Sequence, residues 1–240
     1  EPELDLFAVE MSLDGLGENH DALRETPGGF DKMMRSYRLL AELLAEYPNF
    51  ELGINTVFCS ENQDRMDEII DFVQGLEHVK THTISLVRGN LAHAGFKDVD
   101  YGKYRHATEK LEKNLKHRTS GIYRFRGARL KAAQDILQRR LIYRTALEQT
   151  RLGPCYAGRL NLVLTETGGV YPCETLTESF GNVRDFNYDF AQILRSEPAR
   201  AVARSIEAAH CHCTHECYAM TNILFNPRQY PALLKEYLQL

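Results

Sequence analysis

The sequence lacks a long apolar run, a basic leader and a marked excess of charge. No stretch approaches the roughly 18 apolar residues of a membrane-spanning helix, and residues 1–5 hold no basic group leading into an apolar segment, as a signal peptide would. With 29 basic against 33 acidic side chains, the net charge of -4 gives no overall field that favours nucleic acid or anionic lipid. We therefore expect a cytoplasmic protein with no membrane span, and we do not expect nucleic acid as a partner.

The composition is that of a folded chain. Of the 240 residues, 43% are hydrophobic and 26% are charged, which excludes intrinsic disorder and provides one large core or two modest ones. The chain has no internal repeat and no low-complexity segment.

The first 90 residues alternate between strand and helix patterns. Strands are predicted at 6–13, 50–58 and 79–87, and helices with one apolar face at 30–47 and 62–75. Strands that alternate with single helices over about thirty residues predict right-handed β-α-β units and a parallel sheet.

The pattern changes after Gly89, since residues 90–150 hold no convincing strand. Two helices, at 101–116 and 128–149, form a helical connector over 96–150. Beyond Pro154, short strands at 160–165 and 170–173 flank a glycine turn and predict a hairpin. A helix at 188–209 and a terminal helix from 231 complete the chain. We expect three domains, at 1–95, 96–150 and 151–240.

Cysteines gather in the last third of the chain. Five of the six lie there, namely Cys155, Cys173, Cys211, Cys213 and Cys217. In a cytosolic chain this clustering favours metal or iron–sulfur ligation over disulfides. Zinc would take four sulfurs, or sulfurs with His210, His212 or His215, whereas a [4Fe–4S] cluster would take four thiolates. The spacing alone does not separate these two.

The spacing also resembles that of a known family. Twelve residues separate Cys155 from Gly168, four separate Gly168 from Cys173, and Cys213-x-x-x-Cys217 follows later. This pattern is similar to the C-terminal auxiliary-cluster domain of radical S-adenosylmethionine (SAM) enzymes, in its SPASM or shortened twitch form. The resemblance implies that Cys155 and Cys173 ligate an auxiliary [4Fe–4S] cluster, with further ligands from Cys211, Cys213 and Cys217. Five candidates favour one cluster of the twitch type. The Cys-x-Cys departs from the family spacing and leaves the fourth ligand open.

The N-terminal part resembles the same family. Ser12-Leu13-Asp14-Gly15 is similar to the motif that ends the fourth strand of the radical SAM barrel, and the next two strands fit the fifth and sixth. The resemblance implies an α/β fold, in which residues 1–95 are the C-terminal half of a partial (β/α) barrel, followed by the connector and an iron–sulfur hairpin domain. The implied SAM-binding residues are Ser12, Asp14, Arg24, Asn55 and Leu86. From the residues alone, Asp14 is equally a turn residue, Arg24 a solvated loop residue and Cys59 a buried small hydrophobe.

The motif that binds the SAM-cleaving cluster, Cys-x-x-x-Cys-x-x-Cys, does not occur in residues 1–60. We expect this motif, with a second [4Fe–4S] cluster, in a preceding segment, so that the chain as given is a C-terminal fragment that is inactive alone. A natural paralogue that lost the chemistry is the alternative.

The family resemblance implies a radical SAM enzyme. In such enzymes a reduced cluster cleaves SAM to a 5′-deoxyadenosyl radical, which removes hydrogen from a peptide, sugar or small metabolite. An electron donor such as flavodoxin or ferredoxin is the implied partner. The catalytic residues of this chain stay unknown. The rival hypothesis is a non-catalytic zinc- or iron–sulfur-binding structural module.

One region is strongly basic. It runs through residues 124–131 and continues at Arg139, Arg140 and Arg144. We favour a solvated face of the connector helix. The alternative is a local site for a phosphorylated, nucleotide-linked or lipid-linked substrate, because arginine forks suit phosphate oxygens.

Overall fold

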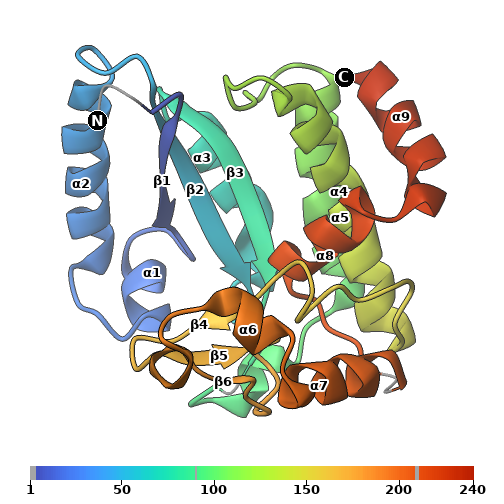
Figure 1. Cartoon of the computed structure of the whole chain (residues 1–240). Helices are drawn as coiled ribbons and strands as arrows, with labels where there is room; N and C mark the ends of the chain where they lie inside the picture. The colour runs from blue at the N-terminus through green and yellow to red at the C-terminus, as the bar shows by residue number, and fades with distance from the viewer. Residues whose placement is uncertain (1–3, 90, 209–210) are drawn as a thin grey trace. The chain divides into compact units, whose positions relative to one another are not determined.

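A computed structural model describes residues 4–89, 91–208 and 211–240 (Figure 1). The chain forms two compact units, one of residues 1–143 with 232–240, and one of residues 144–231. No helix within the described residues is long and apolar enough to cross a membrane.

A parallel sheet is the centre of the first unit. Its strands are β1 (Phe7–Ser12), β2 (Phe50–Phe58) and β3 (Val79–Leu86), in the order β1-β2-β3. Both pairings are parallel. The predicted α/β fold and its parallel sheet are confirmed, and β2 has the predicted bounds.

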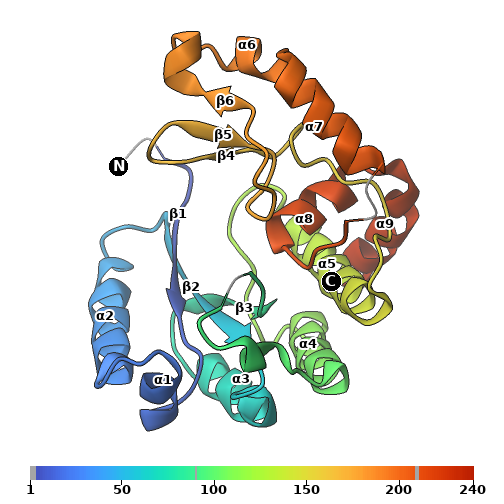
Figure 2. The ribbon, with the colours of Figure 1, turned by 90° about the horizontal axis from the view of Figure 1, so that it is seen from below.

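Four helices cover one face of this sheet (Figure 2). They are α1 (Glu18–Leu23), α2 (Gly29–Leu43), α3 (Met66–Gln74) and α4 (Tyr101–Lys116). Apolar strand residues such as Leu52, Ile54 and Phe58 are fully buried there. The sequence predicted a loop where α1 lies, and it extended the next helix to residue 47, where turns follow Leu43. Short 3-10 turns lie at Gln63–Arg65 and Ala94–Lys97.

The opposite face of the sheet is polar. Ser12 of β1 is level with Asn55 of β2, which is level with Thr83 of β3. Two residues before Asn55 on β2, Gly53 lies between Glu10 of β1 and Thr81 of β3. A Cβ at this glycine would meet Thr81 Oγ1 at 2.6 Å. Glycine therefore lets these two polar side chains approach each other across the strand.

The connector helices are held by ion pairs. Both α4 and α5 (Ala128–Glu148) match the prediction, and the chain ends in α9 (Tyr230–Gln239). Glu236 of α9 is 2% exposed and lies 2.9 Å from Lys116 Nζ and 2.7 Å from Arg140 Nη1. Both cations also bind Glu112, so a four-residue network joins the three helices.

The second unit has a small antiparallel sheet of β4 (Val163–Leu164), β5 (Gly169–Tyr171) and β6 (Gly181–Asn182). The predicted hairpin is β4-β5, and Gly168 at its turn has a φ of 87°, in the region that favours glycine. The strand β6 was not predicted.

Helices complete the second unit. The helix predicted at 188–209 is two helices, α6 (Phe190–Leu194) and α7 (Glu197–Ala208), while residue 209 lies outside the described residues. A helix that was not predicted, α8 (Glu216–Leu224), follows the last cysteines. Two 3-10 turns lie at Val183–Phe186 and Pro227–Gln229.

Candidate functional site

Two of the predicted cysteine ligands are anchored in the core of the second unit. Cys173 follows β5, is 8% exposed and packs in a cluster with Val170, Phe180 and Tyr218. Its sulfur lies 3.2 Å from Thr175 Oγ1. Cys155 is half-buried and packs against the same cluster. Cys211, Cys213 and Cys217 are exposed.

The pKa values of Cys155 and Cys213 are raised by neighbouring thiols. Burial raises the pKa of Cys155, and the negative charges of Cys211 and Cys173 raise it further. Cys213 is exposed as a whole residue, but desolvation of its sulfur raises its pKa. The charges of Cys155, Cys173 and Cys211 raise this pKa further. Because such electrostatic effects fall off with distance, these four sulfurs lie in one neighbourhood.

The fifth cysteine is linked to this neighbourhood through an aromatic ring. Burial raises the pKa of Tyr218 to about 12, with Cys173 and then Cys217 as further causes. The neighbourhood is open: within residues 4–89, 91–208 and 211–240, no three His, Cys, Asp or Glu side chains stand close enough to hold a metal ion.

The nearby histidines have other partners. His215 is 4% exposed, binds Glu174 Oε2 through Nε2 at 2.7 Å and stands edge-on to Tyr218 at 4.8 Å. His212 Nε2 lies 3.1 Å from Gln149 Oε1. His210, the third alternative zinc ligand, lies outside the described residues.

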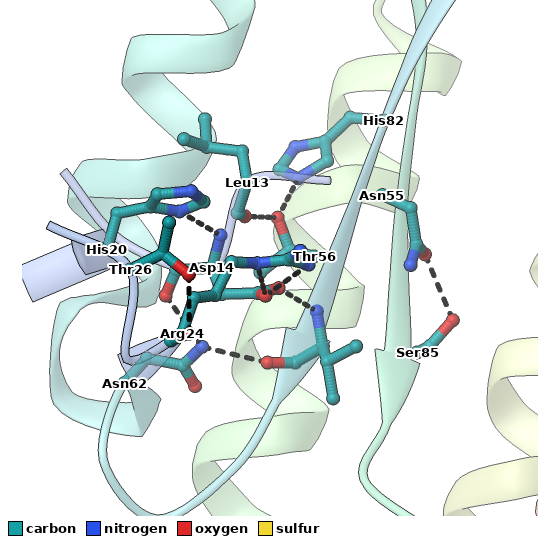
Figure 3. Close-up of polar contacts among 11 residues, drawn as sticks. Leu13, Asp14, His20, Arg24, Thr26, Asn55, Thr56, Asn62, His82 and Ser85 are labelled. Atoms are coloured by element: carbon teal, nitrogen blue, oxygen red, sulfur yellow. Dashed lines mark hydrogen bonds and ion pairs between the residues drawn. The ribbon is translucent and has the colours of Figure 1, made fainter. Parts of the chain in front are cut away.

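In the first unit, Asp14 and Arg24 bind each other at the end of β1 (Figure 3). Asp14 is 5% exposed, and its Oδ2 accepts from Arg24 Nε at 2.8 Å and pairs with Arg24 Nη2 at 2.7 Å. Its Oδ1 accepts from the main chain of Val57 at 2.8 Å. Asn62 donates to the Asp14 carbonyl at 2.9 Å. The carboxylate therefore fastens the loop after β1 to the end of β2.

A buried hydroxyl and two imidazoles extend this arrangement. His20 Nδ1 accepts from the Asp14 main-chain nitrogen at 3.2 Å. Thr56 donates to the Leu13 carbonyl at 2.6 Å and lies 2.9 Å from His82 Nε2 (Figure 3). Burial, with a smaller contribution from Arg139, lowers the pKa of His82 to about 3, so this imidazole is neutral.

Sequence reasoning missed Thr56, Asn62 and His82. Asn62 offered a signal, since an asparagine directly before a helix pattern is a common main-chain partner. Thr56 and His82 offered none, because their residue types are ordinary within strands.

Ser12 and Asn55 lie together on the polar face. They are level in the register of β1 and β2. The Asn55 side-chain oxygen accepts from Thr83 and Ser85 hydroxyls, each at 3.0 Å, which fixes the orientation of the amide. Leu86 is 4% exposed on the helix-covered face, so only its main chain reaches the strand ends. The structure thus brings Ser12 to Asn55 and Asp14 to Arg24, while the Leu86 side chain points away from the polar face.

A cavity of about 200 Å³ lies beside these strand ends, on the side of Asp14. Asn62, Arg65 and Phe96 are among its lining residues. In parallel sheets the carboxyl ends of the strands are the usual place for a bound ligand.

Comparisons with known proteins concern both units. Residues 155–218 match the SPASM family, described as an iron–sulfur cluster-binding domain. No curated protein matches the chain in a search by sequence.

Solved structures of the radical SAM enzyme anSMEcpe share the fold of the chain. The complex with AdoMet and the Kp18Cys peptide has a TM-score of 0.56 at 14% identity, covering 98% of this chain and 70% of that one. The complex with AdoMet and the Cp18Cys peptide has a TM-score of 0.54 at 16% identity, covering 97% and 66%. The chain thus spans about two thirds of the length of these structures. Residues 155–218 thus match the SPASM family of iron–sulfur cluster-binding domains, and the chain shares the fold of the anSMEcpe structures.

Proposed function

We propose that this chain is part of a radical SAM enzyme, with one auxiliary [4Fe–4S] cluster bound by its C-terminal cysteines and SAM bound at the ends of β1, β2 and β3. One observation carries the proposal: the segment that matches a cluster-binding family is also where four thiols gather.

The cysteines suit an iron–sulfur cluster in chemistry and in placement. Thiolates are the usual ligands of such clusters, and repulsion among gathered thiolates is relieved by bound iron. Cys155 and Cys173 would hold the buried side, because both pack on the core. Exposed Cys211, Cys213 and Cys217 would supply the remaining ligands by a shift of their loop. Five thiols support one cluster, as in the twitch form.

The strand ends suit a nucleoside-type ligand. Ser12 and the Asn55 amide nitrogen would donate to it directly, and Leu86 would offer its main chain. Asp14 and Arg24 would act by positioning, because they hold the loop after β1 in place. When bound, SAM and a reduced cluster supply the 5′-deoxyadenosyl radical for hydrogen abstraction from the substrate.

The substrate class is proposed as a peptide, sugar or small metabolite. The peptide bound in the anSMEcpe complexes supports the first of these. An electron donor of the flavodoxin or ferredoxin type is the proposed partner.

Anaerobic reconstitution of the chain with iron and sulfide tests the cluster. We expect about four iron and four sulfide per chain, with visible absorbance that Cys155→Ala or Cys173→Ala removes. Cys59→Ala is the matched control, since Cys59 is a buried cysteine of the first unit. Stoichiometric zinc without acid-labile sulfide would instead support the structural module.

A further inference from the structure

A small cavity lies beside the free edge of β3. Its volume is about 40 Å³, and it is lined by residues of β3, α4, α5 and the segment between these helices. All of these residues lie in the first unit. Gly121 closes in on the strand here, since a Cβ on it would stand 3.0 Å from the Lys80 carbonyl oxygen.

Arg139 of α5 lines this cavity and has one unsatisfied nitrogen. Its Nη1 is buried and has no hydrogen-bond partner among the described residues. Burial is the largest influence on its pKa and lowers it. A buried guanidinium nitrogen without an acceptor is costly, and proteins seldom keep one without a use.

Neighbouring basic residues have acceptors of their own. Arg140 pairs with Glu112 and Glu236, and Arg144 pairs with Glu148. The reading of the basic region as a solvated face therefore fits exposed Arg144 but not Arg139.

The rest of the lining is polar. Lys131 Nζ is bound to Asp135 at 2.5 Å, and Asp135 and Glu112 favour the charge of Arg139 through space, although its Nη1 has no acceptor among the described residues. Thr81 donates to the Tyr123 hydroxyl at 3.3 Å and Tyr123 donates to Glu10 Oε1 at 3.2 Å, so both hydroxyl protons are already used. The third titratable neighbour, His82, is neutral and adds no positive charge.

The size of the cavity restricts the anion. A single water needs roughly 10–15 Å³ of such space. About 40 Å³ therefore admits about three or four water-sized atoms, which matches the three heavy atoms of a carboxylate. A tetrahedral phosphate has five heavy atoms and requires more room.

We propose that this cavity, the Arg139 cavity, binds the carboxylate group of a small organic acid or of an acidic substrate. Arg139 would donate to it through Nη1, the lining nitrogen that has no acceptor among the described residues. The proposal rests on neither SAM nor the cluster.

Acetate is the probe, added to the 240-residue chain labelled with 15N-arginine. We expect one Nε–Hε signal, that of Arg139, to shift and saturate with acetate. Arg139→Gln should remove this signal and weaken acetate binding, measured by saturation transfer to the acetate methyl group, at least tenfold. Arg144→Gln, which removes an exposed charge from the same helix, should bind like the unaltered chain.

Further experiments distinguish a free acid from an acidic substrate and control for misfolding of the variants. Binding of a short peptide that is lost when its carboxylates are amidated would support a substrate; acetate binding without it would support a free acid. Arg139→Lys, checked by circular dichroism, keeps the charge and should bind at least threefold more weakly. Unchanged acetate binding in folded Arg139→Gln would overturn the proposal, and so would an equal response to inorganic phosphate. The absence of any signal shift at 100 mM acetate, about the concentration that saturates a site with a millimolar dissociation constant, would also overturn it.

Discussion

At the scale of a single residue, His82 makes the stability of the fold depend on pH. Its imidazole lies beside Thr56 with Nδ1 buried, and desolvation, with a smaller contribution from Arg139, lowers its pKa to about 3. In the unfolded chain the same group has a pKa near 6.5. Below that pH the unfolded chain binds a proton that the folded chain does not, so stability falls as the pH falls toward 3.

We predict that His82→Gln flattens this pH dependence. Between pH 6 and 4 each group of this kind contributes up to about 1.4 kcal/mol per pH unit to the slope. Urea unfolding across that range measures it. His117→Gln, at an exposed position after α4, should leave the slope as it is. Equal slopes in the His82 variant and the unaltered chain would contradict the assignment.

Arg139 gives a second prediction at this scale. Replacing a buried charge that lacks an acceptor with an apolar side chain of similar length removes its desolvation cost. Arg139→Met should therefore raise the free energy of unfolding by about 1–3 kcal/mol. Urea unfolding without added anions is the measurement, with Arg144→Met expected to change it by less than about 0.5 kcal/mol. A destabilised Arg139→Met chain would show that the guanidinium has an internal partner.

What the sequence could predict at this scale follows from the distance between partners. Asp14, Arg24 and Asn55 stood out because the N-terminal segments that contain them resemble the radical SAM barrel, so the resemblance assigned them a role. Thr56 and His82 are 26 residues apart, and Asn62 binds an atom of a residue 48 positions earlier. Such pairs exist only once the fold has brought the strands together.

Among the elements, α9 depends on one buried carboxylate. Burial by itself would raise the pKa of Glu236, but Lys116 and Arg140 outweigh it and the pKa is lowered. A lowered pKa means that the contribution to stability is present above the usual glutamate pKa and is lost as the pH falls through the folded value.

We predict that Glu236→Gln destabilises the chain by about 2–4 kcal/mol at pH 7, because both cations then lose a buried partner. Limited proteolysis should cut α9 earlier than in the unaltered chain. Glu197→Gln, which removes an exposed ion-paired carboxylate from α7, is the control and should behave as the unaltered chain. Equal protease resistance of the two variants would contradict the role of the network.

The hairpin of β4 and β5 gives a further prediction for the elements. Two- and three-residue strands are too short to persist alone, so ligation at Cys173 should contribute several kcal/mol to their folding, roughly in line with structural metal sites. Cys173→Ala should lose cluster absorbance and expose residues 155–217 to protease. Cys59→Ala should do neither. Full absorbance with intact protease resistance in the Cys173 variant would refute the ligand assignment.

Elements were predictable where the local pattern and the tertiary structure agree. The β2 strand has its predicted bounds because its apolar run ends at turn signals. The predicted helix at 188–209 breaks at Ser196, whose hydroxyl accepts from the Ala199 nitrogen and begins a new helix. Pro198 lies in the first turn of that helix, where its missing N–H costs nothing. Ser196 and Pro198 are therefore a helix-start signal in the sequence, but the continuous apolar periodicity predicted a single helix.

At the scale of the whole molecule, the cysteine inventory limits the chemistry. The six cysteines contain no Cys-x-x-x-Cys-x-x-Cys group. A cluster whose four irons all have thiolate ligands offers no open position to the amino and carboxylate groups of SAM. The cysteines at 155–217 are already engaged in the proposed auxiliary site, and Cys59 is a single buried thiol.

We therefore predict that the 240-residue chain, reconstituted anaerobically and incubated with SAM and dithionite, forms no 5′-deoxyadenosine above the level of free iron–sulfide controls. Chromatography of the nucleosides is the measurement. The same sample should keep its full auxiliary-cluster absorbance, which separates a missing SAM-cleaving cluster from a failed reconstitution. Turnover above the control that survives Cys155→Ala and Cys173→Ala would require a catalytic cluster on other ligands. Turnover lost in both variants would assign SAM cleavage to the C-terminal cysteines themselves, since only an iron left open there can bind SAM.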